Sequence, residues 1–216
     1  MQIVRYAALV STPWKNGAGI TREIIRQPNT GHFRWRLSLA DIAQSGPFSE
    51  FTGYRRIMAL LEGNGVVLRF EGGESRTLLN AGEHVEFSGG VRTHCELIDG
   101  PCVDLNLMIL ESLPAPAVQV LEPSALRERA TLHAAADGVT VVVALAGGIV
   151  LQPTAPGHGA PGRLERWDSA VLLPGDGAVR LAAEGGGGGV VGAAAHGGAR
   201  GAALGERAWV AELKGL

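Results

Sequence analysis

The chain has 216 residues, 46% of them hydrophobic, and a formal net charge of −2. This composition allows a packed core and excludes global disorder, while the absence of a basic stripe argues against nucleic acid as a partner. No apolar run reaches the roughly 18 residues of a membrane-spanning helix, so we expect no membrane association. The first ten residues lack the long apolar stretch and cleavage site of a signal peptide, which favours a cytoplasmic location.

The most informative segment is residues 13–23, PWKNGAGITRE. It mixes an indole, an ammonium, an amide, a hydroxyl, a guanidinium and a carboxylate without a helical period or a strand alternation. Its proline and glycines predict a loop whose backbone can approach another group closely. Two interpretations stay open: a surface loop that Trp14 anchors to the core, or a binding loop in which Lys15 and backbone N–H groups face a small polar or anionic ligand.

Short strands dominate the rest of the first half. Residues 33–42 alternate apolar and polar side chains, which is the pattern of a half-buried strand. Either the face with Trp35 or the face with Arg36 lines the interior. Gly-rich turns then separate the strands about every eight to twelve residues, as in an antiparallel sandwich or barrel. These further strands are predicted at residues 56–61, 66–70, 75–79, 84–88, 94–98 and 102–109.

A proline-rich hinge from residue 113 divides the chain into expected domains at residues 1–112 and 113–216. Ser124 is predicted to cap one short helix over residues 125–129. Strands follow at 138–145 and 149–152, and the glycine run at 185–189 predicts a flexible turn. Most aromatic residues precede residue 90, so we expect the first half to carry the ligand site and the second half to be its structural partner.

Two pairs of segments indicate that a β-unit is duplicated. Residues 58–68 resemble residues 143–151, and residues 79–87 resemble residues 165–173. The offset is close to 85 residues in both places, which indicates a fold-level repeat rather than a solenoid.

Catalytic and metal signatures are sparse. The two cysteines, Cys95 and Cys102, are too few for a disulfide framework and predict reduced, buried thiols. No H-x-H or H-E-x-x-H pattern occurs, and His84 and His94 would form a metal site only if they met across a hairpin. There is also no G-x-S-x-G elbow, Walker loop or dinucleotide fingerprint. We therefore expect no metal and no cofactor.

Four segments stand in an order that resembles the HutD/Ves family of cupin-like proteins. They are PWKNGAGITREI at 13–24, FRWRLSLADI at 33–42, SGPFSEFTGYRRIMALLEGNGVVL at 45–68 and VDLNLMI at 103–109. The resemblance implies an all-β bicupin, in which two small antiparallel β-barrels or sandwiches pack together in one chain and the second is degenerate. It also implies a polar pocket and a regulatory role in histidine utilisation. The usual triple glycine reads Gly17-Ala18-Gly19, which would strain Ala18 if that position needs a positive φ.

The predicted site is cationic on one side and amide-rich on the other. Lys15, Arg36 and Arg56 offer positive charge to a carboxylate, and the resemblance implies that Arg36 faces the ligand. Asp104 and Asn106 share one face of a strand; they either pair with an arginine or receive a ligand's amino or imidazole group. Glu23 is expected as a surface charge beside Arg22 or Arg26. The full predicted ligand-binding set is Trp14, Lys15, Asn16, Gly17, Thr21, Arg36, Ser38, Arg56, Asp104 and Asn106.

The predicted site is rich in polar residues but contains no recognisable nucleophile. We therefore expect it to bind a ligand rather than to catalyse a reaction. The expected ligand is a small carboxylate of histidine breakdown, either urocanate or a formyl- or formimino-glutamate. The alternative is a metal-independent cupin enzyme, an isomerase or lyase acting on a small polar acid, for which Lys15, Glu23 or Asp104 would need a pKa near the working pH. A third interpretation makes the Gly/Ala-rich second half a protein interface. A homodimer is also compatible with the sequence.

Overall fold

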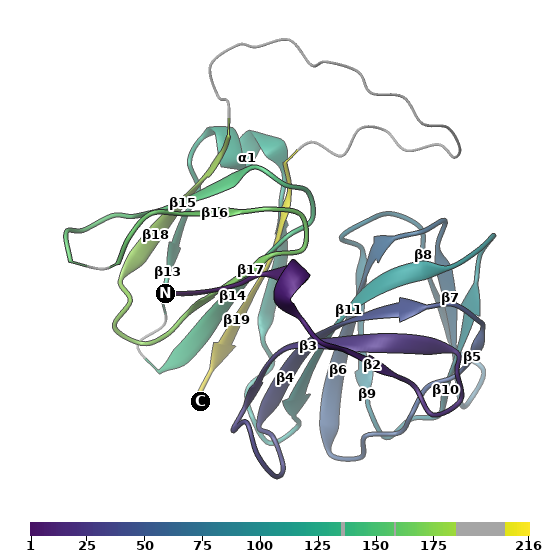
Figure 1. Ribbon diagram of the computed structural model, residues 1–216. Coiled ribbons are helices and arrows are strands. Elements are labelled where there is room, and N and C mark those ends of the chain that lie inside the picture. The colour runs from purple at the N-terminus through teal and green to yellow at the C-terminus, as the bar shows by residue number, and fades with distance from the viewer. Residues whose placement is uncertain (135–136, 158, 185–205) are drawn as a thin grey trace. The chain divides into compact units, whose positions relative to one another are not determined.

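The structure is a computed structural model that describes residues 1–134, 137–157, 159–184 and 206–216 (Figure 1). It divides into two compact units. The N-terminal unit comprises Ala7–Ala115 with Gly215–Leu216, and the C-terminal unit comprises Met1–Tyr6 with Pro116–Lys214. Strands make up most of both units, which confirms the expected all-β class. The glycine run at 185–189, His158 and His196 lie outside the described residues.

Two antiparallel sheets form the N-terminal unit. The larger has the strand order β2-β3-β4-β11-β6-β9 and the smaller has the order β5-β10-β7-β8. Both sheets are open, so they do not form the closed barrel that was one of the expectations. The strands are β2 (Ser11–Pro13), β3 (Gly19–Gln27), β4 (Trp35–Ile42), β5 (Gly46–Pro47), β6 (Tyr54–Glu62), β7 (Val66–Phe70), β8 (Ser75–Leu78), β9 (His84–Ser88), β10 (Thr93–Leu97) and β11 (Cys102–Leu110).

The core of the N-terminal unit lies between these two sheets. Ile42 of β4 and Met58 of β6 share one cluster with Leu68 of β7 and with Cys95, and both cysteines are free and buried, as predicted. Side chains alternate along a strand, and Arg36 is an even number of residues from Ala40 and Ile42, so it lies on this inner face. The neighbouring leucines of β4 are buried on the opposite face. The Arg36 face is therefore the one that looks between the sheets.

Residues 13–23 are not a single loop, which corrects the sequence prediction. β2 and β3 pair as a hairpin, and only residues 14–18 form its turn. The Trp14 N–H donates to the Gly19 carbonyl, and the Gly17 N–H donates to the Trp14 carbonyl. Gly17 takes the positive φ, 71°, that a tight turn requires, so Ala18 is not strained. Consequently Thr21 and Glu23 are strand residues, and their side chains are held by the sheet.

The C-terminal unit also contains two open antiparallel sheets, with the orders β1-β17-β14-β19-β12 and β13-β18-β15-β16. Side chains from both sheets share one core cluster. The short helix α1 (Pro123–Arg127) begins at Pro123 with Glu122 at its N-cap and no side-chain cap, so the predicted Ser124 cap is wrong. The strands are β1 (Gln2–Val4), β12 (Ala117–Leu121), β13 (Thr131–His133), β14 (Gly138–Ala144), β15 (Ile149–Pro153), β16 (Gly162–Leu164), β17 (Ser169–Leu172), β18 (Ala178–Ala183) and β19 (Ala208–Lys214).

The two units repeat one topology. The order β4-β11-β6-β9 in the N-terminal unit corresponds to β12-β19-β14-β17 in the C-terminal unit, and β5-β10-β7-β8 corresponds to β13-β18-β15-β16. Every strand number shifts by the same amount, which confirms the duplicated β-unit that the sequence indicates. Among the described residues the units differ at their edges, because the N-terminal unit carries the β2–β3 hairpin beside this repeat and the C-terminal unit carries the single strand β1. No helix in the described part of the chain is long and apolar enough to cross a membrane.

Candidate functional site

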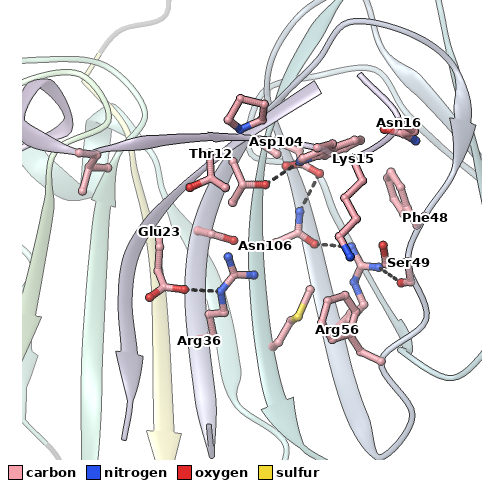
Figure 2. A pocket seen from close by; sticks show the side chains of 18 of the residues that line it. Thr12, Lys15, Asn16, Glu23, Arg36, Phe48, Ser49, Arg56, Asp104 and Asn106 are labelled. Atoms are coloured by element: carbon pink, nitrogen blue, oxygen red, sulfur yellow. Dashed lines mark hydrogen bonds and ion pairs between the residues drawn. The ribbon is translucent and has the colours of Figure 1, made fainter. Parts of the chain in front are cut away.

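A cavity of about 980 Å³ opens on the inner face of the larger sheet in the N-terminal unit (Figure 2). Strands β4, β6 and β11 supply its polar side chains, while the β2–β3 hairpin and the segment after β5 supply further walls. Every residue of the predicted ligand-binding set lines this cavity except Gly17, whose role is to shape the hairpin turn. The structure thus gathers side chains from four distant parts of the sequence around one space.

A chain of hydrogen bonds crosses the cavity from Arg56 to Asp104 (Figure 2). Arg56 Nη2 donates to Asn106 Oδ1 at 2.8 Å, and Asn106 Nδ2 donates to Asp104 Oδ2 at 2.8 Å. The sequence left open whether Asp104 pairs with an arginine or receives a ligand group. The structure links Asp104 to Arg56 only indirectly, because the Asn106 amide lies between the two charged groups. This arrangement also fixes the orientation of the Asn106 side chain, because each end of the amide has a charged partner.

Asp104 is an unusual carboxyl group. Only 1% of its surface is exposed, and its Oδ1 atom has no hydrogen-bond partner among the described residues. Burial raises the pKa of Asp104 to about 7, although the positive charge of Arg56, the Asn106 hydrogen bond and a hydrogen bond from the Ala40 backbone act in the opposite direction. A carboxyl group with this pKa exchanges its proton within the neutral range.

Aromatic rings surround the guanidinium of Arg56. The Phe48 and Phe87 ring centroids lie 4.9 and 5.1 Å from its central carbon, and the Phe51 centroid lies 5.9 Å away. Such contacts stabilise a buried cation through the negative faces of the rings. Burial lowers the pKa of Arg56 to about 10, so the group stays charged at neutral pH. Its Nε atom is buried without a partner in the described structure, which leaves one donor unused.

Arg36 pairs with Glu23 across β3 and β4. Its Nε donates to Glu23 Oε2 at 2.7 Å, and both side chains line the cavity. The expectation that Glu23 is a surface charge beside Arg22 or Arg26 is wrong, because Arg22 bonds Asp41 instead. Glu23 is absent from the predicted ligand-binding set, although the alternative enzyme interpretation named it, because residues 13–23 carry no strand alternation that would show its direction.

The hairpin turn holds Trp14 and Lys15 over the cavity. Trp14 Nε1 donates to Thr21 Oγ1 at 2.7 Å, and the indole packs edge-on against Phe48. Gly19 passes beneath this indole, where a β-carbon would lie only 2.5 Å from the Asp41 carbonyl oxygen. Trp14 therefore both anchors the hairpin and lines the cavity.

Lys15 is the one cation of the cavity without a partner in the described structure. It makes no hydrogen bond or ion pair there, and in Figure 2 its side chain extends toward the Arg56 guanidinium. Lys15, Arg36 and Arg56 face Glu23 and Asp104 around the cavity. The lining thus has one excess positive charge when Asp104 is ionised and two when Asp104 is protonated. The cavity lining is therefore net positive in both protonation states of Asp104.

Sequence reasoning missed several uncharged lining residues. Met108 follows Asn106 by two positions on β11 and shares its face, a signal that the same alternation rule would have found. Phe48, Ser49 and Phe51 belong to the segment after β5, and no local pattern showed which way that segment turns. Phe48 and Phe51 add aromatic rings to the cavity wall beside the Arg56 guanidinium.

The structure does not meet the condition under which two histidines would have formed a metal site. His84 lies on β9 of the larger sheet and His94 on β10 of the smaller sheet, so the two do not meet across a hairpin. Within the four described ranges, no group of three or more His, Cys, Asp or Glu residues is placed to hold a metal ion.

The fold places the chain in a class. A cupin 2 conserved barrel domain protein from Leptotrichia buccalis has a TM-score of 0.56 with this chain at 14% identity, over 99% of this chain and 96% of that one. The paired antiparallel sheets and the polar inner face define an all-β, cupin-like protein. The profile of the HutD family matches residues 6–190, and the chain belongs to this family.

Solved relatives span nearly the whole chain. A conserved protein of unknown function from Pseudomonas aeruginosa PAO1 is 33% identical with a TM-score of 0.75, over 99% of this chain and 97% of that one. HutD from Pseudomonas fluorescens SBW25 is 26% identical with a TM-score of 0.74, over 99% and 98%. An uncharacterized 21.2 kDa protein in the hutC 3′ region of Pseudomonas putida is 44% identical over 110 residues, 50% of this chain and 57% of that protein. The chain thus spans about half the length of the curated relative it matches.

Proposed function

We propose that the cavity of the N-terminal unit binds a small carboxylate metabolite and that this binding serves a regulatory role in histidine utilisation in the cytoplasm. The observation that carries the proposal is the convergence of Lys15, Arg36 and Arg56 on one cavity, with Lys15 left unpaired in the described structure. Cationic side chains in a partly buried site favour an anion, and arginine grips carboxylates with particular geometric fit. Membership of the HutD family supports the link to histidine utilisation.

Three ligands of that pathway suit the cavity: urocanate, N-formylglutamate and N-formiminoglutamate. Each carries a carboxylate for the cations and a planar imidazole, formamide or formimino group for the aromatic side with Trp14 and Phe48. The Pseudomonas fluorescens HutD structure represents a formate condition, and formate is the smallest carboxylate. The cavity exceeds each of these molecules in volume, so water or a larger relative would share the space.

The repeated topology supports a bicupin, with the ligand site in residues 1–112 and a degenerate module in residues 113–216. The C-terminal unit has the same strand order as the N-terminal unit, but its inner face is occupied by an apolar cluster. In this proposal the second module is a structural partner that has no ligand of its own.

Titration calorimetry with the three compounds tests the proposed function. We expect at least one to bind more tightly than millimolar, and Lys15→Ala and Arg36→Ala each to weaken it about tenfold or more, because each removes a charged hydrogen-bond donor. Lys214→Ala is the matched control, since it removes an exposed lysine of the C-terminal unit and should change nothing. The proposal is overturned if no compound binds below millimolar, or if both cavity variants bind like the wild type.

One observation favours an enzyme as the second candidate. Asp104 lines the cavity with a pKa of about 7, the range in which a carboxyl group can act as a general acid or base. Conversion of any of the three compounds by purified, chelator-treated protein, with loss of turnover in Asp104→Asn, would support a metal-independent isomerase or lyase. Unchanged compounds after prolonged incubation with saturating protein would exclude this alternative for them.

A further inference from the structure

We propose that the cavity takes a dicarboxylate together with one proton, and that Asp104 receives that proton. The inference rests on the proposed function and deepens it, because it separates ligands by charge. A glutamate derivative with two carboxylates would bind with proton uptake, whereas a monocarboxylate such as urocanate would bind without it.

Asp104 lies where the charge of a bound anion would favour its protonation. Its carboxyl group is completely buried, with Oδ1 unpartnered in the described structure, so one oxygen is available to hold a proton. Its other oxygen connects through the Asn106 amide to the guanidinium of Arg56, with both hydrogen bonds 2.8 Å long. A carboxylate that engages Arg56 or Lys15 therefore adds negative charge within a few atoms of Asp104, where water screens poorly.

The charge balance sets the number of protons. With Asp104 ionised, the cavity lining carries three positive and two negative side chains, so one bound carboxylate neutralises it. A second carboxylate would leave an uncompensated negative charge in a partly buried site, which is costly. Protonation of Asp104 removes that excess. A dicarboxylate and a proton together are the neutral combination.

The groups around Asp104 do not provide an equally placed proton acceptor. Burial raises the pKa of both neighbouring thiols, Cys95 on β10 and Cys102 on β11, so they remain neutral. Burial lowers the pKa of Arg56 on β6 only to about 10, so it remains charged. Glu23 is already engaged by Arg36, and Asp41 by Arg22. The full set of titratable or charged groups facing Asp104 is Lys15, Glu23, Arg36, Asp41, Arg56, Cys95 and Cys102.

A matched ligand pair tests the proposal on the wild-type protein. N-formyl-L-glutamate and N-formyl-L-glutamine have nearly the same shape but differ by one negative charge. Calorimetry in buffers with different ionisation enthalpies counts the protons exchanged on binding. At pH 8 we expect about one proton taken up with the glutamate and none with the glutamine. At pH 6 the uptake with the glutamate falls toward zero, because Asp104 already holds its proton.

Asp104→Asn gives the second arm of the test. The wild type should lose affinity for N-formyl-L-glutamate about tenfold per pH unit above pH 7, whereas Asp104→Asn should bind it equally well from pH 6 to pH 8 and without proton uptake. Glu74→Gln is the control, because it removes an exposed carboxylate of the same unit that lies outside the cavity, and it should behave like the wild type.

The two proposals fail in distinguishable ways. If neither formyl compound nor urocanate binds, the proposed function is wrong. If N-formyl-L-glutamate binds at pH 8 without proton uptake, or if folded Asp104→Asn keeps the uptake, binding stands and the role of Asp104 is overturned. Should Asp104→Asn not fold, the wild-type comparison of the two ligands decides alone.

Discussion

The two units of the chain place different side chains on the same topology. Alignment of their core clusters makes Leu60 of β6 equivalent to Ala144 of β14, and the strand register then relates the neighbouring positions. The N-terminal unit has Arg56, Asp104 and Asn106 on the inner face of its larger sheet. At the corresponding positions the C-terminal unit has Thr140, Ala208 and Val210.

This difference shows how one scaffold provides either a cavity or a filled core. Ala208 and Val210 belong to the apolar cluster of the C-terminal unit, where they need no polar partner. In the N-terminal unit the same positions hold a charged network that lines open space, with two buried polar atoms left unpartnered among the described residues. Buried polar groups of this kind cost stability, so their presence points to a function rather than to folding.

Removal of the buried cation should produce the largest change in stability. Arg56→Ala leaves Asp104 and Asn106 without their positive partner and should cost the N-terminal unit about 3–5 kcal/mol. Thr140→Ala, at the equivalent position, removes only a hydrogen bond to the His133 carbonyl and should cost the C-terminal unit about 1 kcal/mol. Native-state hydrogen exchange of β6 and β14 peptides measures each unit separately. Equal losses in the two units would contradict the contrast drawn between them.

Asp104 should make the stability of the N-terminal unit depend on pH. Its pKa rises from 3.8 to about 7 on folding, so between these values the folded state holds more protons than the unfolded state. Stability contributed by Asp104 therefore falls as pH rises, by at most about 1.4 kcal/mol per pH unit, and levels off above pH 7. Urea unfolding of the wild type and Asp104→Asn from pH 5 to pH 8 gives this contribution as a difference. A flat difference, or one that rises with pH, would count against it.

The hairpin anchor should have the smallest effect. Thr21→Val removes the acceptor for Trp14 Nε1 and should cost about 1 kcal/mol. Ser169→Ala in the C-terminal unit removes a buried hydroxyl that has no partner in the described structure, and should be nearly neutral. Thermal unfolding of both variants provides the comparison. A larger loss in Ser169→Ala than in Thr21→Val would show that the Trp14–Thr21 bond does not hold the hairpin.

Local patterns predicted most of the strands but not the first hairpin. β7 and β9 begin and end at the predicted residues, because apolar alternation stops at Gly-rich turns there. β3 was missed because its polar residues hide the alternation and glycines precede it. The sequence comparison of the two halves is shifted by one residue relative to the structure. It aligns Met58 with Val143, whereas the residue that occupies the equivalent core position is Val142. A one-residue slip reverses the faces of a strand, and letter similarity does not detect it.

The sequence predicted most of the polar residues that line the cavity, but not the hydrogen bonds between them. Spacing alone placed Asp104 and Asn106 on one face, whereas the direction of Arg36 was indicated only by the family resemblance. The amide bridge to Arg56 depends on the pairing of β11 with β6, which brings residues fifty positions apart into contact. Glu23 lies on the β2–β3 hairpin and Phe48 in the segment after β5. Tertiary packing sets the direction of both segments, so the sequence did not show that these side chains line the cavity.

Exchange of the three distinguishing residues tests the central claim most directly. Arg56→Thr, Asp104→Ala and Asn106→Val together give these positions of the N-terminal unit the side chains of its C-terminal counterpart, and they remove the charged partners together so that no buried charge is left unpaired. We predict a folded triple variant whose calorimetric titration with N-formyl-L-glutamate shows no binding. A folded triple variant that binds N-formyl-L-glutamate with wild-type affinity would contradict the claim that this network forms the ligand site.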